Sequence, residues 1–245
     1  MTAAPPAPAP GPDLPGWALR MVWRDLCFMH WPVAPHLLAP GLPHGLELDT
    51  YGGQAWLGVV PFRMTGVAPR GLPSVPGLSD FAELNLRTYV TAGGVPGVWF
   101  YSLDADQPLG VRLARTFFHL PYFDARLWAS HERGVTRYAG LRTHRGQPPL
   151  RFAAAYRPEG EAFTAPQGSL EDFLTHRLFL YSADRQGRVY RGPIAHRPWP
   201  LRRARAVIRE NTLAAPLGLD LMGLGEPHLL HAERLDVRAG LIRQV

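Results

Sequence analysis

The amino-acid sequence predicts an α+β fold in which antiparallel β-sheet dominates. Three observations carry this prediction: short segments rich in β-branched and aromatic residues recur along the chain, Pro and Gly separate them, and helical patterns are fewer. The chain has 245 residues, 46% of them hydrophobic and 19% charged, which is ample material for one large core. No repeat of fixed period appears, which argues against solenoids and propellers.

The expected elements are short and are distributed along most of the chain. Strands are expected over residues 54–64, 81–90, 98–104, 134–142, 150–156, 178–183 and 229–237. Helices are expected over residues 31–39, 109–118, 169–175 and 199–209. The third helix begins with Ser169 and Asp172 in a Ser-x-x-Asp capping pattern, in which the two side chains satisfy free amides of the first turn.

The beginning of the chain differs in composition from the rest. Residues 1–16, MTAAPPAPAPGPDLPG, contain six prolines and too few apolar residues to anchor a stable element, so we expect a disordered tail followed by a single domain over residues 17–245. The tail lacks the basic start and continuous apolar core of a signal peptide, and no later stretch approaches about 18 uninterrupted apolar residues. The sequence therefore predicts a cytoplasmic protein that spans no membrane.

All 26 basic residues of the chain are arginine, and lysine is absent. A guanidinium stays protonated in proteins, so it cannot attack a carbonyl as a lysine amine does. Schiff-base catalysis by a lysine, lysine-anchored pyridoxal phosphate and a P-loop lysine are excluded. A coding bias toward arginine explains the composition, but the consequence for mechanism is the same whatever the cause.

Metal and cofactor motifs are missing from the sequence. Cys27 is the only cysteine, so neither an internal disulfide nor a cysteine metal site can form. His228 and His231 lie three residues apart on an expected strand and should point to opposite faces. The glycine-rich segments 50–54 and 92–97 are typical of turns, and neither forms G-x-G-x-x-G before a helix. We expect no metal and no cofactor.

A basic segment stands out between residues 176 and 209. It contains nine arginines and one acidic residue, Asp184. Such a segment can attract anions, but few aromatic residues are interleaved with the arginines, and no helix-turn-helix, RNA-recognition or zinc-finger pattern is present. We interpret it as a solvated basic face and do not expect nucleic-acid binding. A non-enzymatic interaction protein that uses residues 177–209 remains an alternative.

One expected strand, FAELNLRTYV, separates polar from apolar side chains. A period of two places Phe81, Glu83, Asn85, Arg87 and Tyr89 on one face, while the other face is apolar apart from one threonine. The polar face either is turned to water or lines a ligand cavity inside a barrel. Periodicity alone does not decide between these alternatives.

The next expected strand, GVWFYSLDAD, begins with bulky apolar residues on both faces. This pattern indicates a central strand that is covered on both sides, with Ser102 and Asp104 emerging toward one rim. Ser102 belongs to neither a G-x-S-x-G elbow nor an S-x-x-K motif. A Ser- or Tyr-based hydrolase is therefore the weakest of the alternatives.

Several segments together resemble the YqjF-like family of uncharacterised proteins. They are, in chain order, FAELNLRTYV, GVWFYSLDA, LPYFDA, FLTHR, HRPWPL and HLLHAERLDV, and the match runs from about Trp23 to about Val237. That family is similar in fold to acetoacetate decarboxylase. The resemblance implies a cone-shaped β-barrel that encloses a pocket, with peripheral helices; it leaves a homo-oligomer open.

The resemblance also assigns positions to individual residues. In acetoacetate decarboxylases a proline precedes two lysines, the first of which forms the Schiff base. Here Pro121 precedes Tyr122 and Phe123, and Arg115 and Ala125 stand in comparable places. The nucleophile of the decarboxylases is therefore missing from this chain.

The decarboxylases also carry an aromatic-x-glutamate segment that lines the pocket, which residues 81–83 resemble. The resemblance therefore implies that Glu83 faces the cavity, together with Asn85, Arg87 and Tyr89 by strand parity. This favours the interior alternative for the polar face.

The sequence thus predicts a protein that binds a small carboxylate or oxo-acid ligand without Schiff-base chemistry. Arg87 would hold a carboxylate through paired hydrogen bonds, Glu83 could act as a base if its surroundings raise its pKa, and Tyr122 could donate a proton. A lysine-independent lyase, hydratase or hydrolase that uses these three residues is an alternative, as is an internal Glu83–Arg87 pair with a structural role. The further candidate ligand-binding residues are Asn85, Tyr89, Ser102 and Arg115.

Overall fold

A computed structural model of the protein describes residues 14–245. Most of the predicted tail, residues 1–13, lies outside the described residues. Residues 14–16 form a turn in which the amide of Trp17 donates to the carbonyl of Leu14, and the first strand follows.

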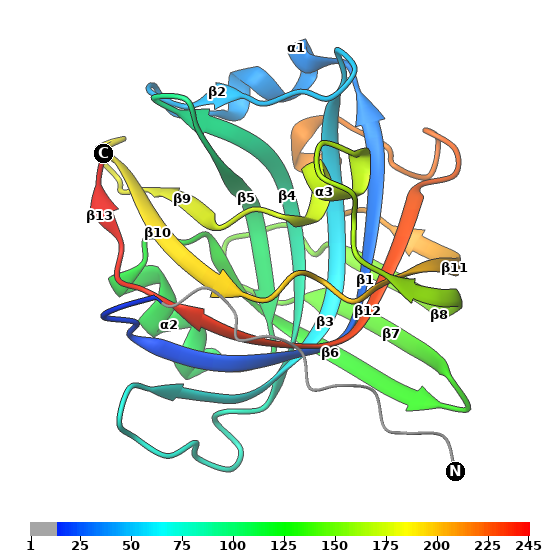
Figure 1. Cartoon of the computed structure of the whole chain (residues 1–245), viewed down its shortest axis with the longest axis horizontal. Helices are drawn as coiled ribbons and strands as arrows, with labels where there is room; N and C mark the ends of the chain where they lie inside the picture. The colour runs from blue at the N-terminus through cyan, green and yellow to red at the C-terminus, as the bar shows by residue number, and fades with distance from the viewer. Residues whose placement is uncertain (1–13) are drawn as a thin grey trace.

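The described chain forms one sheet of 13 strands with short helices around it (Figure 1). The strands are β1 (Leu19–Val33), β2 (Glu47–Leu48), β3 (Ala55–Pro69), β4 (Phe81–Ala92), β5 (Val95–Ala105), β6 (Tyr122–Glu132), β7 (Val135–Arg142), β8 (Arg151–Phe163), β9 (Phe179–Ala183), β10 (Val189–His196), β11 (Leu201–Asn211), β12 (His228–Ala239) and β13 (Arg243–Gln244). The α-helices are α1 (Pro35–Leu38), α2 (Pro108–Phe117) and α3 (Leu170–Thr175), and short 3-10 turns cover Ala39–Gly41 and Ala215–Leu217.

The sheet closes on itself twice. Strands β12, β1, β3, β4, β5, β9 and β10 are each bonded to the next, and β10 is bonded to β12; we call this the first ring. A second ring runs from β5 through β6, β7, β8 and β11 to β12 and returns through β1, β3 and β4. Most pairs are antiparallel, but β5 is parallel to both β6 and β9. The sequence-based prediction of a predominantly antiparallel α+β fold is confirmed.

Five strands, β12, β1, β3, β4 and β5, belong to both rings and form what we call the shared wall. Most side chains of β1, β3, β4 and β5 are buried or half-buried on both faces because each face is turned toward a different ring, whereas β12 leaves four side chains exposed. On one face Phe28 and Phe62 pack inside the first ring; on the other Leu84 and Leu86 pack against Tyr138 of the second ring. The core is therefore divided into two compartments by a single layer of strands.

The expected strands correspond to β3, β4, β5, β7, β8, β9 and β12, and two expected helices correspond to α2 and α3. Ser169 caps α3 as predicted, because its hydroxyl accepts a hydrogen bond from the amide of Asp172. The helix expected over residues 31–39 is wrong in its first half, where Trp31 to Val33 end strand β1. The proline at residue 35 starts only a short helix, α1.

The helix expected over residues 199–209 is also wrong, because these residues enter strand β11. Alanine and arginine favour helices in isolation, but pairing with β8 and burial of alternate side chains override that preference. Ala204, Ala206 and Ile208 pack against the core of the second ring, while Arg205 and Val207 between them and Arg209 after them are exposed.

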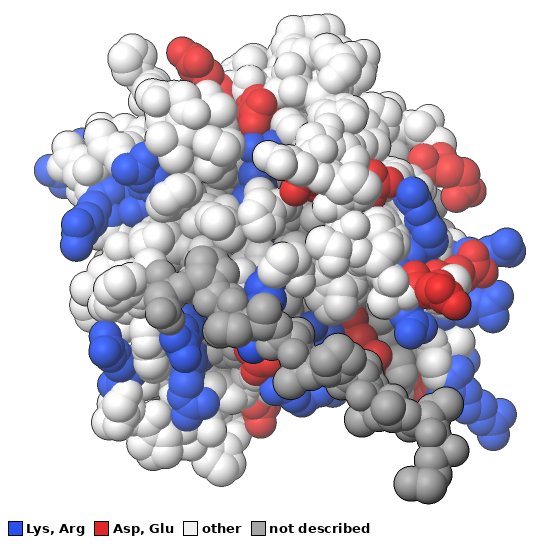
Figure 2. All heavy atoms as spheres, in the orientation of Figure 1, with Lys and Arg blue, Asp and Glu red and all other residues white. Residues whose placement is uncertain are grey.

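The basic segment is partly neutralised by ion pairs with carboxylates. Four of its nine arginines are paired with carboxylates: Arg177 with Asp49, Arg188 with Asp184, Arg203 with Glu171 and Arg205 with Glu159. On the face shown in Figure 2, basic side chains lie in several separate groups, with acidic ones among those at the right. None of the helices in residues 14–245 has the length and hydropathy to cross a bilayer.

Candidate functional site

Strand β4 carries its polar side chains into the first ring. Glu83, Asn85 and Arg87 oppose Phe62, Val60 and Gly58 of β3, which lie on the same face. Glu83 and Asn85 are buried, and Arg87 is half-buried. The polar face is therefore turned to the interior of the first ring and not to water.

Glu83 accepts a hydrogen bond from Tyr122, whose hydroxyl lies 2.8 Å from Oε2. Tyr122 reaches it from β6, where it pairs with Leu103 of β5. Burial raises the pKa of Glu83 to about 8, although the hydrogen bonds from Tyr122 and Asn85 oppose the shift. The carboxyl is thus largely neutral at neutral pH, and its pKa suits a group that exchanges protons.

Arg87 lies beside the C-terminal end of α3. Its Nη2 donates to the carbonyl of Leu174 at 3.1 Å and to the hydroxyl of Tyr89 at 3.4 Å, and its guanidinium carbon lies 5.3 Å from the ring centre of Phe28. The Nε atom is buried with no partner. Among residues 14–245 no carboxylate lies within ion-pair distance of Arg87. The internal Glu83–Arg87 pair is therefore not formed.

Tyr89 links the strand to α3 and to His30. Its hydroxyl donates to the carbonyl of Leu174 at 2.6 Å, and Nε2 of His30 lies 2.6 Å from the same oxygen. Since the hydroxyl has one hydrogen, His30 donates from Nε2, and its buried Nδ1 is left as an acceptor without a partner. Burial and the charge of Arg87 lower the pKa of His30 well below its usual value.

The neighbours of His30 in the chain, FMHW, carry no sign of this contact. A better indication is Gly58, which opposes His30 on β3. A Cβ at Gly58 would lie 2.7 Å from Nε2 of His30, so only glycine leaves room for the imidazole. The imidazole at His30 thus requires a glycine at Gly58, although the two residues are far apart in the sequence.

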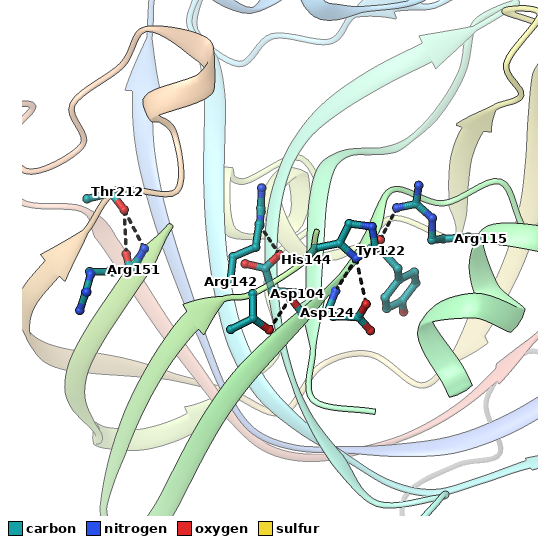
Figure 3. Close-up of polar contacts among 9 residues, drawn as sticks. Asp104, Arg115, Tyr122, Asp124, Arg142, His144, Arg151 and Thr212 are labelled. Carbon is teal, nitrogen blue, oxygen red and sulfur yellow. Dashed lines mark hydrogen bonds and ion pairs between the residues drawn. The ribbon is translucent and has the colours of Figure 1, made fainter. Parts of the chain in front are cut away.

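The other two candidate residues lie away from this cluster. Tyr101 is an extra residue in β5, because Leu86 pairs with Ser102 while Arg87 pairs with Phe100. The bulge turns Ser102 to the face opposite Arg87, where its hydroxyl is buried with no partner. Arg115 is exposed on α2 and donates from Nη1 to the carbonyl of Tyr122 at 2.6 Å (Figure 3).

A second buried ionic cluster lies on the opposite face of the shared wall. Nε of Arg142 donates to Oδ1 of Asp104 at 2.8 Å, and both side chains are almost fully buried. The guanidinium carbon of Arg142 lies 4.2 Å from the ring centre of Phe123. Nearby, Nδ1 of His144 lies 3.0 Å from Oδ2 of Asp124 (Figure 3). Burial raises the pKa of Asp104 to about 6, against the effect of Arg142. The two residues of this pair are 38 positions apart, and no motif in the sequence connects them.

The histidines do not gather around a common point. On β12, His228 pairs with His30 of β1, and His231 pairs with Cys27. Because His228 and His231 are three residues apart on the strand, their side chains lie on opposite faces of β12. Within residues 14–245, no three His, Cys, Asp or Glu side chains are close enough to share a metal ion.

Comparisons with known proteins place the fold and the family. Among solved structures, an acetoacetate decarboxylase-like enzyme from Sphingomonas wittichii RW1 is similar with a TM-score of 0.65 at 12% identity, covering 93% of each chain. The enduracididine biosynthesis enzyme MppR complexed with pyruvate gives a TM-score of 0.64 at 15% identity, covering 94% of this chain and 91% of that one. Acetoacetate decarboxylase from Legionella pneumophila gives 0.63 at 14% identity, covering 99% and 92%. The acetoacetate-decarboxylase-like fold is thus confirmed.

Sequence comparison gives a nearer relative. The uncharacterised protein YqjF of Bacillus subtilis is 44% identical over 221 residues, which is 90% of each chain. A family model for DUF2071, described as an uncharacterized conserved protein, matches residues 20–236. The chain therefore belongs to the DUF2071 family, whose members include YqjF-like proteins.

Proposed function

We propose that the protein binds a small organic carboxylate, specifically an oxo-acid, inside the first ring, with Arg87 as the group that receives the carboxylate. The observation that carries this proposal is a guanidinium in the interior that has no carboxylate partner among residues 14–245. A planar guanidinium forms paired hydrogen bonds with a carboxylate, and such bonds are strongest where water is scarce.

The surroundings of Arg87 favour an anion over a cation. Glu83 is largely neutral at neutral pH, and His30 is kept neutral by its lowered pKa. Burial also lowers the pKa of His196 to about 4, so this imidazole adds no charge. Nε of Arg87 is a donor without a partner. An incoming carboxylate would satisfy that donor and neutralise the arginine.

A protein of similar fold supports the ligand class, and the absence of lysine from this chain limits the chemistry. One structure with this fold holds pyruvate, which is an oxo-acid. The present chain has no lysine, and Tyr122 occupies the place where the resemblance puts the Schiff-base lysine. The proposal therefore assigns binding without a covalent imine between the ligand and a lysine.

Binding of oxo-acids should depend on Arg87. Isothermal titration with pyruvate, acetoacetate and 4-oxopentanoate, which differ in the spacing between carbonyl and carboxylate, is expected to give saturable binding of at least one of them. Arg87→Met should weaken that binding by about tenfold or more, since a hydrogen-bonded charge contact is lost. Arg87→Lys should retain part of the affinity, because it keeps the charge but not the planar fork.

Arg191→Met is the matched control for this experiment. Arg191 is also half-buried and packs against an aromatic ring, with its guanidinium carbon 5.0 Å from the centre of Phe179, but it lies on β10 outside the cluster. Urea unfolding of each variant shows whether the fold is kept. Equal affinity in the wild type and in a folded Arg87→Met variant would contradict the proposal, as would equal losses in both variants.

A second candidate function, proton transfer at a carbon next to the carbonyl, is favoured by the Glu83–Tyr122 pair. Its carboxylate would remove a proton from the carbon, leave an enolate, and return a proton to the same carbon. In deuterium oxide, the protein should accelerate exchange of the methyl protons of pyruvate, followed by proton NMR, with a rate that rises as pH rises through about 8. Glu83→Gln should abolish the acceleration, whereas Glu161→Gln, which changes an exposed glutamate of β8, should not. An acceleration that persists in Glu83→Gln would exclude Glu83 as the base, and no acceleration by the wild type would assign the protein to binding alone.

A further inference from the structure

A surface hollow of about 850 Å³ lies where β6 and β9 separate from β5. β9 pairs with β5 at Val98 and Trp99, and β6 pairs with it from Leu103 onward. Between them, residues 100–102 have no strand partner on this edge among the pairings of residues 14–245. The hollow is therefore a fork in the sheet that helix α2 and the β9–β10 turn surround.

Three arginines line the hollow without a carboxylate partner among the described residues: Arg112, Arg115 and Arg185. One carboxylate, that of Asp184, also lies there, but it already accepts hydrogen bonds from Arg188 at 2.6 Å and from Tyr190 at 3.2 Å. Those bonds lower the pKa of Asp184. The hollow consequently carries uncompensated positive charge.

The local sequence explains why these arginines converge. Arg112 and Arg115 are three residues apart in α2 and lie on one side of it. The helix is followed by His119, which takes the left-handed conformation with φ of 50° and packs its ring 4.8 Å from that of Tyr190. This contact holds the end of α2 against β10.

The third arginine is placed by the β9–β10 turn. Oδ1 of Asp184 accepts hydrogen bonds from the amides of Gln186 at 2.9 Å and Arg188 at 3.0 Å, which fixes the turn that carries Arg185. Two elements that are far apart in the sequence thus bring arginines to the same hollow.

Aromatic side chains supply the rest of the lining. Trp99, Tyr101 and Phe123 border the hollow, and the Nε1 atom of Trp99 is buried without a hydrogen-bond partner. The guanidinium carbon of Arg115 lies 5.6 Å from the ring centre of Phe123. Flat apolar surface next to several guanidinium groups is suited to a ligand that has both a ring and an anionic group.

We propose that this hollow binds an organic anion in which a planar ring carries a phosphate or carboxylate group. The anionic group contacts the guanidinium groups of Arg112, Arg115 and Arg185, and the ring packs against the aromatic lining. The volume lies within the roughly 300–1,000 Å³ of small-molecule sites. The site is distinct from the cluster of Glu83 and Arg87, because Tyr122 points into that cluster whereas its neighbour Phe123 borders the hollow.

Four small probes separate the contributions of ring and charge: phenyl phosphate, benzoate, inorganic phosphate and benzyl alcohol. In isothermal titration, phenyl phosphate or benzoate is expected to bind, and the comparison of the two identifies the preferred anionic group. Inorganic phosphate and benzyl alcohol should each bind at least about tenfold more weakly than the better of these ligands, since each lacks one element. Inorganic phosphate that binds as tightly as phenyl phosphate would overturn the assignment of a ring.

The double variant Arg112→Gln/Arg185→Gln should weaken binding of the better probe by about tenfold or more. Arg126→Gln/Arg137→Gln removes the same number of charges from exposed arginines of β6 and β7 and is the matched control. Equal losses in the two double variants would show nonspecific attraction to a basic protein and would overturn the proposal. Arg87→Met should leave this binding unchanged, which separates the hollow from the interior site.

Discussion

Replacement of Arg142 by methionine is expected to lower the free energy of unfolding at pH 8 by about 3–5 kcal/mol. The substitution keeps an apolar contact with Phe123 but leaves the carboxylate of Asp104 buried without a counter-charge. Breaking a buried pair costs more than the pair contributes, since the remaining charge has lost both water and its partner. Urea unfolding followed by tryptophan fluorescence measures the loss.

The loss should depend on pH because Asp104 can take up a proton. The pKa of Asp104 is about 6, because burial raises it and the charge of Arg142 lowers it. Removal of Arg142 therefore raises the pKa of Asp104 further. At pH 5 the carboxyl is neutral in both proteins, and the destabilisation should be smaller than at pH 8. The variant Asp104→Asn/Arg142→Met should recover part of the stability at pH 8. The same loss at pH 5 and pH 8 would contradict the assignment of a buried charged partner.

Replacement of Glu83 by glutamine is expected to remove a fall in stability with rising pH. The folded protein retains a proton on Glu83 up to a pKa of about 8, whereas the unfolded chain releases it near 4.5. Between these values the folded state binds more protons, so the free energy of unfolding falls as pH rises, by up to about 5 kcal/mol in total. Above pH 8 the variant should therefore be more stable than the wild type.

The clearest window lies between pH 7 and pH 8. Asp104 has finished titrating there, and histidines of the unfolded chain have lost their protons near 6.5. Over this one unit the wild type should lose about 1 kcal/mol relative to Glu83→Gln. Urea unfolding at both pH values gives the difference directly. Parallel slopes for the two proteins would mean that the carboxyl of Glu83 is already ionised in the folded state.

Local patterns predicted much of the fold because many strands are rich in β-branched and aromatic residues and are bounded by Pro and Gly. The long strands β1, β6, β10 and β11 were not expected, and β1 and β11 illustrate two different reasons. β1, LRMVWRDLCFMHWPV, belongs to the shared wall and lacks the alternation of a half-exposed strand, since both of its faces are buried. β11 has the composition of a helix and becomes a strand through its pairing with β8.

In the candidate site, too, local patterns predicted some features, while contacts between distant residues could not be predicted. The period of β4 was sufficient to place Glu83, Asn85, Arg87 and Tyr89 on one face, since strand parity is a local property. The partner of Glu83 was indicated only by the family resemblance, which set Tyr122 at the position of the lysine. The contact of Tyr89 with His30 and the Asp104–Arg142 pair join residues from distant parts of the chain, which one sequence cannot reveal.

The single extra residue in β5 has an evolutionary consequence. Because of the bulge at Tyr101, residues on its two sides follow opposite parity, and Ser102 and Asp104 belong to the compartment of the second ring while Phe100 belongs to that of the first. A slip of the segment after Tyr101 by one residue, which straightens the bulge, would pair Ser102 with Asn85 and Asp104 with Glu83 and so deliver a hydroxyl and a carboxyl to the face of Arg87. A fold with a wall shared by two interiors can thus present a new set of reactive groups to one of them by a change of strand register, with no change in its amino acids.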